Sequence, residues 1–308
     1  MQTILGANGV IGTELARALP SFTDHIRLVS RQPQPVNESD ELFSADLTDP
    51  AQTAAAVAGS EVAYLSVGLP YKLRVWQEQW PHVMKKVLDA CEKHGTKLVF
   101  FDNVYLYGKV DGWMTEESPV NPCSKKGHVR AQIAAMLMEA VEKGKVQALI
   151  ARSADFYGIT PMSFLTAMVF EKYVAGKSAQ WMVNDAFLHS FTYPPDAGKA
   201  TALPGNRPEA YGQVWHLPTD PEVLTGAEFL ELAAAAFGAQ YKYQILPKWM
   251  LRMLGLFIGV VKEGVEMLYQ NEADYLFDSS KFERHFDFQP TSHEAGLAAI
   301  AAHYQRER

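Results

Sequence analysis

Short runs of apolar residues alternate with segments of helical period along the first half of the chain. The runs are continuously apolar, as in parallel strands that helices cover on both faces, and they occupy 2–5, 26–30, 62–67, 97–102 and 146–152. Apolar residues at spacings of three and four predict helices over 75–94 and 124–143. This alternation predicts an α/β fold built on a doubly wound parallel sheet.

The second half of the chain is less regular. Helical periods predict helices at 160–175, 227–237, 249–257, 262–269 and 291–303. Shorter apolar runs predict strands at 180–183, 213–217 and 241–246. Turn residues are frequent over 193–208, so we expect an irregular segment there.

A glycine-rich turn follows the first predicted strand and opens a helix. Its sequence is Gly6-Ala7-Asn8-Gly9-Val10-Ile11-Gly12. Gly6 permits the tight turn, Gly9 lets backbone N–H groups approach a pyrophosphate, and Gly12 lets the helix lie close to the sheet. A turn without a ligand would carry the same glycines, but the strand before it and the helix after it favour a dinucleotide site.

The end of the second predicted strand indicates which dinucleotide binds. It reads Ser30-Arg31, where an acidic residue would hold the ribose 2′-hydroxyl of NAD(H). We therefore favour NADP(H), with NAD(H) left open; the alternative is that Arg31 is a solvated loop residue. Asp46, after the third strand, either accepts a hydrogen bond from the adenine amine or caps a turn. Three further residues complete the predicted cofactor contacts: Leu47, Val67 and Gly68.

Composition and charge narrow the classes of function. The 308 residues include 28 Lys and Arg against 35 Asp and Glu, and the formal net charge is −7. No basic run stands out, so nucleic acid is not expected as a partner. Two cysteines, Cys91 and Cys123, are too few for a disulfide framework, and the nine histidines lack metal-ligand spacing. We expect neither a metal site nor an oxidising compartment.

The chain has no segment typical of membrane insertion or secretion. Its start lacks a basic region followed by an apolar one, so we expect a cytoplasmic protein. The most apolar late stretch, 249–261, is interrupted by Arg252 and is too short to cross a bilayer. We therefore expect no membrane partner, and we interpret 249–261 as a buried or partner-facing helix.

Further motifs are distributed over most of the chain, at 101–108, 117–130, 152–158, 196–197, 278–281 and 290–291. Together with the glycine loop they resemble the extended short-chain dehydrogenase/reductase family, and more narrowly its NAD(P)-dependent epimerase/dehydratase branch. The resemblance implies a Rossmann-type sheet with a smaller C-terminal substrate lobe, often for nucleotide sugars. On this basis we expect a dinucleotide-binding domain over 1–158, with 185–202 returning to it, and a substrate lobe formed by 159–184 and 203–308.

The catalytic positions of that family are changed in this chain. The family uses a Ser or Thr together with a Tyr and a Lys spaced as Y-x-x-x-K. The resemblance places Asn103 at the hydroxyl position, Lys126 at the tyrosine and Arg130 at the lysine. The family's chemistry, in which a tyrosinate removes a hydroxyl proton, therefore cannot be transferred unchanged.

Lys126 and Arg130 are like charges in the first turns of a predicted helix, where the helix dipole favours anions. Either this segment is well solvated, or an anion such as a cofactor phosphate or substrate carboxylate binds there; we favour the anion. We further expect Lys126 to contact the cofactor and to act as general acid toward a substrate carbonyl.

Other side chains could line the substrate site. Tyr105, Tyr107 and Tyr157 are candidate proton donors, and Tyr107 and Tyr157 are also predicted substrate contacts, although aromatic residues after parallel strands more often line a site or belong to the core. The resemblance places Asp155 where the family carries an Asn near the substrate; a capping role is the alternative. His189 completes the predicted substrate contacts.

These observations leave three hypotheses. The leading one is an NAD(P)-dependent oxidoreductase or epimerase-like enzyme that acts on a small carbonyl or sugar-like substrate through a non-standard catalytic set. The second is a non-catalytic NADP(H)-binding sensor or regulator, because replaced catalytic residues are also what such a protein would show. The third is an interaction module, for which 249–261 is the candidate surface. The oligomeric state is left open, with a homodimer as one option.

Overall fold

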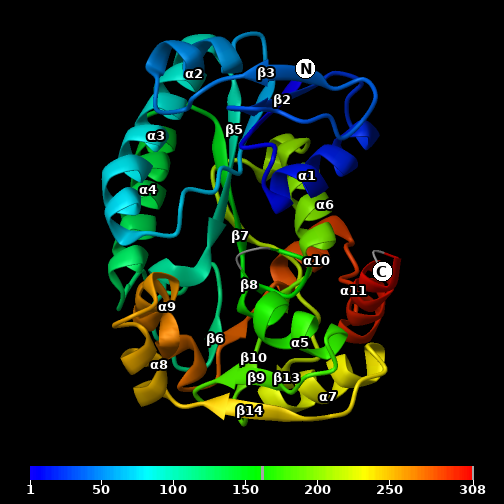
Figure 1. The fold of residues 1–308 in the computed structure, drawn as a ribbon. Coiled ribbons are helices and arrows are strands. Elements are labelled where there is room, and N and C mark those ends of the chain that lie inside the picture. Colours follow the sequence, from blue (N-terminus) through cyan, green and yellow to red (C-terminus); the bar gives the residue numbers. More distant parts are fainter. Residues whose placement is uncertain (161–162, 307–308) are drawn as a thin grey trace.

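The computed structural model describes residues 1–160 and 163–306 and contains a central parallel sheet of seven strands (Figure 1). The order is β12-β7-β5-β4-β1-β2-β3. The strands are β1 (Gln2–Leu5), β2 (Ile26–Ser30), β3 (Glu41–Ser44), β4 (Val62–Leu65), β5 (Lys97–Asn103), β7 (Ala148–Ser153) and β12 (Val214–His216). The chain moves outward from β1 to β3 and then returns to build the other half from β4. The strand order therefore reverses between β1 and β4, where doubly wound folds bind ligands, and the doubly wound prediction is confirmed.

Helices cover both faces of this sheet (Figure 1). One layer consists of α2 (Pro50–Val57), α3 (Leu73–His94) and α4 (Lys125–Glu142). The other contains α1 (Val10–Ala18), α6 (Pro194–Gly205) and α10 (Ser280–Phe286). Alternate residues of each strand serve the two layers: Ala63 of β4 packs with the α3 side and Tyr64 with the α1 side. Both strand faces are thus apolar, which explains the continuous apolar runs in the sequence.

The helix α6 corrects the expectation of an irregular segment over 193–208. Its two leading prolines, Pro194 and Pro195, occupy the first helical positions, where a missing N–H costs nothing. Small residues follow, and a Cβ on Gly198 would lie 2.5 Å from Cβ of Glu14 in α1. Proline and glycine therefore mark a helix start and a close helix contact here instead of turns.

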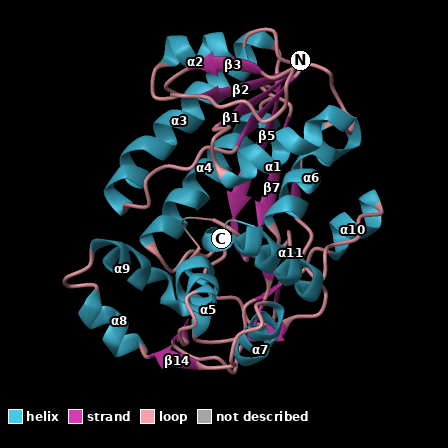
Figure 2. Ribbon diagram, turned by 45° about the vertical axis from the view of Figure 1, so that its right-hand side comes forward, coloured by secondary structure: helices cyan, strands magenta, loops and turns pink. Residues whose placement is uncertain are grey.

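The C-terminal lobe packs below the sheet (Figure 2). Its aromatic core joins a π-helix (Thr166–Phe170), α5 (Glu171–Val174), α7 (Gly226–Ala236), α11 (His293–Arg306), and the parallel pair β9 (Ala179–Met182) and β14 (Tyr243–Leu246). The predicted helix at 160–175 is shorter, since the described helical part begins at 164; residues 161–162 lie outside the description. A capping box between Thr225 and Glu228 fixes the start of α7.

The predicted helices at 249–257 and 262–269 correspond to α8 (Lys248–Leu254), α9 (Gly259–Gly264) and a 3-10 segment (Val265–Asn271). The remaining elements are η1 (Leu19–Ser21), η2 (Val104–Leu106), β6 (Trp113–Met114), β8 (Asp155–Phe156), β10 (Leu188–His189), β11 (Phe191–Thr192), η4 (Pro208–Ala210), β13 (Leu224–Thr225) and β15 (Leu276–Phe277).

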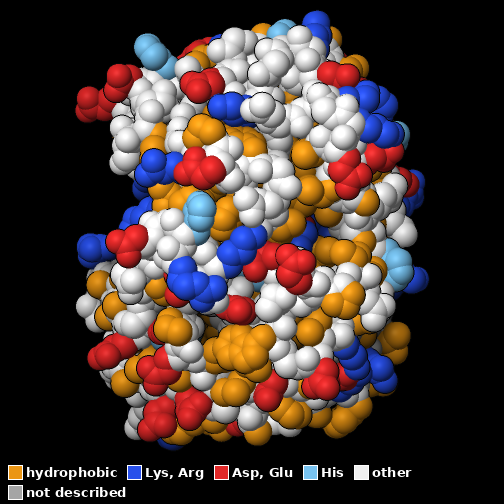
Figure 3. All heavy atoms as spheres, turned by 180° about the vertical axis from the view of Figure 1, so that it is seen from behind, with side chains coloured by type: hydrophobic (Ala, Val, Ile, Leu, Met, Phe, Trp, Pro, Cys, Tyr) orange, Lys and Arg blue, Asp and Glu red, His pale blue; other side chains and the backbone are white. Residues whose placement is uncertain are grey.

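The division into a dinucleotide-binding domain and a substrate lobe stays a prediction, and strand β12 does not follow the predicted ranges. β12 falls within 203–308, the range assigned to the substrate lobe, yet it pairs with β7 as the edge strand of the central sheet. The face opposite to that of Figure 1 mixes basic and acidic side chains over both units, so no single-signed region dominates it (Figure 3).

Candidate functional site

The predicted phosphate loop lies at the carboxyl end of β1 and leads into α1. Gly6 has a φ of 100°, a left-handed conformation that favours glycine, and a Cβ on it would lie 2.4 Å from Cα of Val67. A Cβ on Gly12 would lie 2.6 Å from the carbonyl oxygen of Gly6. The fold itself therefore requires both glycines, because each lets two backbone segments approach closely.

Gly9 differs from them, because the fold leaves room beside it. Apart from its chain neighbours, a Cβ on Gly9 would meet no described atom closer than 3.4 Å. Gly9 is the N-cap of α1 without a side-chain cap, and in the described chain no acceptor is found for the N–H groups of Val10, Ile11 and Gly12. Unpaired amides at a helix N-terminus attract phosphate, so the loop fits a dinucleotide pyrophosphate.

The residues after β2 frame the same loop. The side chain of Asn8 donates to the carbonyl of Gln32 at 2.7 Å, and Ser30 Oγ accepts from the N–H of Gln32 at 3.1 Å. Arg31 is exposed at the surface. No acidic residue ends β2. The strand end is thus open to a ribose bearing either a hydroxyl or a phosphate, and the preference for NADP(H) stays a prediction.

Asp46 caps a turn. It accepts hydrogen bonds at 2.8 Å from both the N–H and the hydroxyl of Thr48, and these bonds lower the pKa of Asp46. Leu47 is buried in the core, Val67 lies against Gly6, and a Cβ on Gly68 would meet nothing within 4 Å. A contact between Asp46 and adenine stays a prediction, since the geometry supports the capping alternative directly.

Lys126 is the most deeply buried of the predicted catalytic side chains, with 1% of its side chain exposed. Its Nζ donates to the carbonyl oxygen of Glu263 at 2.8 Å, to Oε2 of Glu263 at 2.8 Å and to Oε1 of Glu266 at 2.9 Å. The same ammonium lies 4.6 Å from the ring centroid of Tyr71. An ammonium group has three N–H donors, and all three are engaged.

The two glutamates also bind the starts of two helices. Glu263 Oε2 accepts from the N–H of Leu73 at 2.8 Å, and Glu266 Oε2 accepts from the N–H of Lys125 at 2.7 Å. Burial acts to raise the pKa of Glu263, but the hydrogen bonds from Lys126 and Leu73 outweigh it and lower this pKa. Anions therefore do sit at the start of α4, and they are the protein's own carboxylates.

Arg130 lies in a sealed cluster that we call the Asp102 network, formed by Asp102, Arg130, Arg152, Tyr107 and His216. Arg130 Nε donates to Asp102 Oδ1 at 2.7 Å, and Arg152 Nη2 donates to Asp102 Oδ2 at 3.0 Å. Arg130 also stacks on Trp80, 4.7 Å from the ring centroid. The carboxylate is thus shared by two guanidinium groups, and a catalytic role of Arg130 stays a prediction.

Tyr107 belongs to the same network, so it is not a lining residue of an open site. Its hydroxyl accepts from Arg152 Nη1 at 2.6 Å and lies 2.7 Å from His216 Nε2, while His216 Nδ1 lies 2.9 Å from the carbonyl oxygen of Asp278. Burial and the nearby Arg152 hold the pKa of His216 well below its ordinary value. A neutral imidazole that accepts from Tyr107 and donates to Asp278 satisfies every group.

A second cluster forms around Asp155, which follows β7. Asp155 Oδ2 accepts from Gln270 Nε2 at 2.9 Å and lies 3.2 Å from His189 Nε2. The side chain of Asp155 keeps 20% of its surface exposed, whereas His189 is buried and stacks on Phe191 at 4.4 Å between ring centroids. The fold therefore brings together three residues that the sequence analysis singled out: Asp155, His189 and the nearby Tyr105.

Four tyrosines surround this carboxylate, and we call the whole set the Asp155 cluster: Asp155, His189, Gln270, Tyr71, Tyr105, Tyr269 and Tyr275. Asp155 acts electrostatically on all four phenols. Burial, then the neighbouring Tyr71 and Asp155, raise the pKa of Tyr105 well above its ordinary value. The hydroxyls of Tyr269 and Tyr275 are buried and lack a hydrogen bond of standard geometry in the described chain, although each acts on the pKa of the other and Gln270 lowers that of Tyr275. Buried hydroxyls that the chain satisfies only in part can still bond to a ligand.

Two further predicted site residues, Asn103 and Tyr157, make structural contacts. Asn103 Oδ1 accepts from the N–H of Tyr105 at 3.1 Å and so caps η2. Tyr157 is buried in the core of the lobe, where its ring lies 5.2 Å from that of His293. The structure thus places Tyr157 away from the Asp155 cluster and gives Asn103 a backbone-capping contact.

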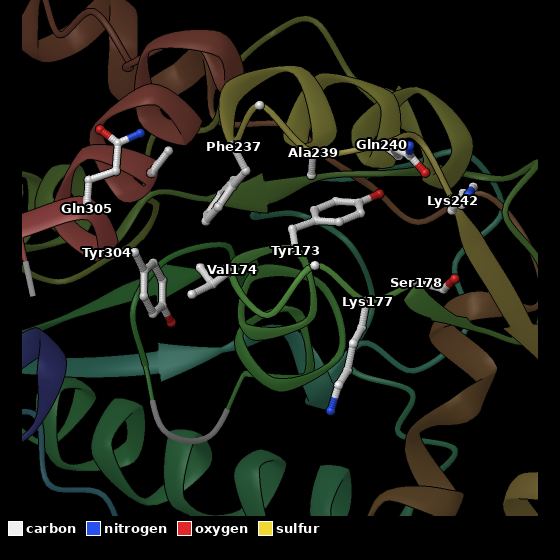
Figure 4. A pocket seen from close by; sticks show the side chains of 13 residues that line it. Tyr173, Val174, Lys177, Ser178, Phe237, Ala239, Gln240, Lys242, Tyr304 and Gln305 are labelled. Carbon is white, nitrogen blue, oxygen red and sulfur yellow. The ribbon is translucent and has the colours of Figure 1, made fainter. Parts of the chain in front are cut away.

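A surface pocket of about 650 Å³ lies elsewhere, between α5, α7 and α11 (Figure 4). Its lining includes Tyr173, Phe237 and Tyr304 and shares no residue with the loop or with the Asp155 cluster. Within residues 1–160 and 163–306, no group of three His, Cys, Asp or Glu side chains is arranged to hold a metal ion. None of the described helices combines the length and apolar character that crossing a bilayer requires.

The chain has relatives among known families and structures. The model of the NAD dependent epimerase/dehydratase family matches residues 3–203. UDP-glucose 4-epimerase from Thermotoga maritima is 15% identical, with a TM-score of 0.80 over 100% of this chain and 99% of that one. A dTDP-glucose 4,6-dehydratase from Streptomyces venezuelae, solved with NAD bound, is 18% identical, with a TM-score of 0.77 over 100% and 97%. No curated protein sequence matches. At such identities the structural likeness shows the fold.

Proposed function

The chain belongs to the NAD-dependent epimerase/dehydratase family, and from this premise we propose an enzyme that oxidises or epimerises a small, sugar-like hydroxyl or carbonyl compound. The observation that carries the proposal is the Asp155 cluster, in which a carboxylate, an imidazole and four phenols meet after strands β5 and β7. Pairs of titratable groups in unlike environments are typical of acid–base sites.

The Asp155 cluster supplies what proton transfer requires. A bound nicotinamide would accept or return hydride, and the chain must then remove or restore the hydroxyl proton. Tyr105 is a phenol whose pKa burial raises further above its ordinary value, and we assign it the role of hydrogen-bond donor to the substrate oxygen. His189, oriented by Asp155 at 3.2 Å, is the base that we assign to proton removal. In this proposal, Tyr105, His189 and Asp155 take the place of the tyrosinate that other members of the family use.

Lys126, Asn103 and Arg130 then act indirectly. All three donors of the Lys126 ammonium are engaged by Glu263 and Glu266, so we assign Lys126 to positioning instead of proton donation. Asn103 caps the η2 turn that carries Tyr105. The Lys126 ammonium is paired with Glu263 and Glu266, and among the described residues no Lys or Arg is paired with Asp155, so the site favours an uncharged substrate over a phosphate-bearing one.

The cofactor is a dinucleotide held by residues 6–12, and we propose that NADP(H) binds more tightly than NAD(H). Support comes from Ser30 and exposed Arg31 at the end of β2, a strand that does not end in an acidic residue. The solved relatives named above include one with NAD bound, so the comparison does not favour the phosphate.

The proposal is tested by following deuterium. The protein is incubated with nicotinamide deuterated at C4 and a panel of neutral sugars, ketones and nucleotide sugars, and label in the product is measured by mass spectrometry. We expect label in a neutral hydroxyl compound. Gly9→Val is the matched control, because its side chain fills the pyrophosphate space while the fold has room for it.

Two outcomes would count against the proposal. Cofactor binding by calorimetry with no label in any product would favour the non-catalytic sensor. Label transfer that persists in Gly9→Val would show that the loop is not the phosphate site.

A further inference from the structure

Residues 248–262 form an apolar projection that shares no residue with the glycine loop or with the Asp155 cluster. This projection comprises α8, the connection 255–258 and most of α9. Figure 2 shows α8 and α9 together at the outer edge of the molecule. Only Leu251 of α8 is buried as an anchor, and α9 has no buried residue.

The apolar side chains of the projection are unusually exposed. Leu256 is 73% exposed, Phe257 83% and Val260 66%. Trp249, at the start of α8, is 66% exposed. A run of large apolar residues in contact with solvent marks a binding surface, since isolated ones are ordinary but clusters are not.

The charge of the projection is one-sided. No Asp or Glu occurs between 232 and 262, whereas Lys248, Arg252 and Lys262 lie within the projection. Arg252 precedes the apolar tip 256–258 by four residues, and Lys262 follows it by four. The projection is therefore positively charged, although the whole chain has a net charge of −7. One cation lies on each side of the apolar tip.

We propose that this projection docks on an anionic lipid surface. The apolar tip enters the boundary between headgroups and acyl chains, and the flanking cations meet lipid phosphates while their stems cover apolar surface. A symmetric contact between two copies would set three cations against three without an acidic residue in the segment to pair with them. The proposal departs from the expectation of no membrane partner, because the segment lies on a bilayer and does not span it.

Vesicle flotation tests the proposal. We expect the protein to float with vesicles of phosphatidylcholine containing 30% phosphatidylglycerol and to float less with phosphatidylcholine alone. Leu256→Ser combined with Phe257→Asp should reduce binding at least tenfold. Neutralising Arg252 or Lys262 with Gln should weaken binding to the anionic vesicles about fivefold for each cation removed. Val120→Asp, at a residue 58% exposed elsewhere, is the matched control.

Several results would overturn the proposal. One is failure of the wild-type chain to bind either vesicle, and another is undiminished binding by the Leu256 and Phe257 variant. If sedimentation shows a dimer that this variant dissociates, and vesicles do not bind, a second copy covers the surface instead. Thermal melting of each variant confirms that it is folded, and a Trp249→Phe comparison shows whether the vesicle-induced fluorescence shift comes from the projection.

Discussion

Two polar clusters lie at the carboxyl ends of the neighbouring strands β5 and β7, and they are built in opposite ways. The Asp102 network is sealed, and every charge in it meets an opposite charge or a hydrogen-bond partner. The Asp155 cluster is partly open: the side chain of Asp155 is 20% exposed, and the hydroxyls of Tyr269 and Tyr275 lack a hydrogen bond of standard geometry in the described chain. Both clusters combine an aspartate, a histidine and tyrosine, but only the Asp102 network contains arginine side chains.

This difference in exposure and hydrogen bonding indicates which cluster stabilises the fold and which could bind a ligand. A buried polar network that is fully satisfied holds structural elements in one arrangement, here β5, β7, β12 and α4. A cluster that leaves donors unpaired has unused capacity for a ligand. The first cluster should therefore respond to mutation through stability and the second through activity.

The largest expected effect comes from breaking the sealed cluster. Asp102→Asn removes the charge shared by Arg130 and Arg152 and leaves two buried cations uncompensated. The free energy of unfolding should fall by about 3–5 kcal/mol, measured by chemical denaturation. Asp111→Asn, at an exposed loop position, is the control and should be near neutral. A loss below 1 kcal/mol for Asp102→Asn would show that the network is not the fold element we describe.

The open cluster should respond in the opposite manner. Asp155→Asn keeps the shape of the side chain but removes the charge that orients His189, so turnover should fall by roughly 10² to 10³. Cofactor affinity and unfolding free energy should change little. The matched control is Asp220→Asn, since Asp220 pairs with His293 at 2.9 Å in the lobe. Equal loss of turnover in both variants would contradict the assignment of Asp155 as the residue that orients a catalytic His189.

The sequence predicts the sheet domain well, because its strands are apolar on both faces and its helices are long. The predicted ranges of β1 and β2 agree with the structure residue for residue. The helix α6 was missed, since Pro194 and Pro195 resemble turn residues until their place in the first helical turn is known. Propensity does not distinguish a proline that begins a helix from one that breaks it.

The site is harder to predict, because its members converge only through topology. Tyr71, Gln270, Tyr269 and Tyr275 come from a loop before α3 and from the 3-10 segment and its continuation, where no periodic signal indicates a shared target. The charges at the start of α4 did predict an anion. Its source could not be predicted, because Glu263 lies 137 residues away from Lys126 in the sequence.

The third prediction concerns Arg31, an exposed charge beside the dinucleotide loop. Arg31→Asp should weaken NADPH binding by about 1.5–3 kcal/mol, a ten- to hundredfold change, because a charge-assisted phosphate contact is lost and a repulsive charge added. NADH binding should change much less. Both are measured by nicotinamide fluorescence, with Arg207→Asp as a control at another exposed arginine. Equal affinity of the wild-type protein for the two cofactors would contradict the phosphate assignment.

The smallest effect is expected where a charged contact is only half-buried, at Glu263. Its folded-state pKa is lowered from the ordinary 4.5, because hydrogen bonds from Lys126 and Leu73 outweigh burial. A lowered carboxyl pKa contributes stability that is present above the unfolded-state value and is lost as pH falls through the folded-state value. Glu263→Gln should therefore cost about 1 kcal/mol at pH 7, and the difference from wild type should shrink below pH 4.5. Denaturation at pH 7, 5 and 3.5 measures it, and a difference that grows toward acid pH would show that Glu263 does not hold Lys126 in solution.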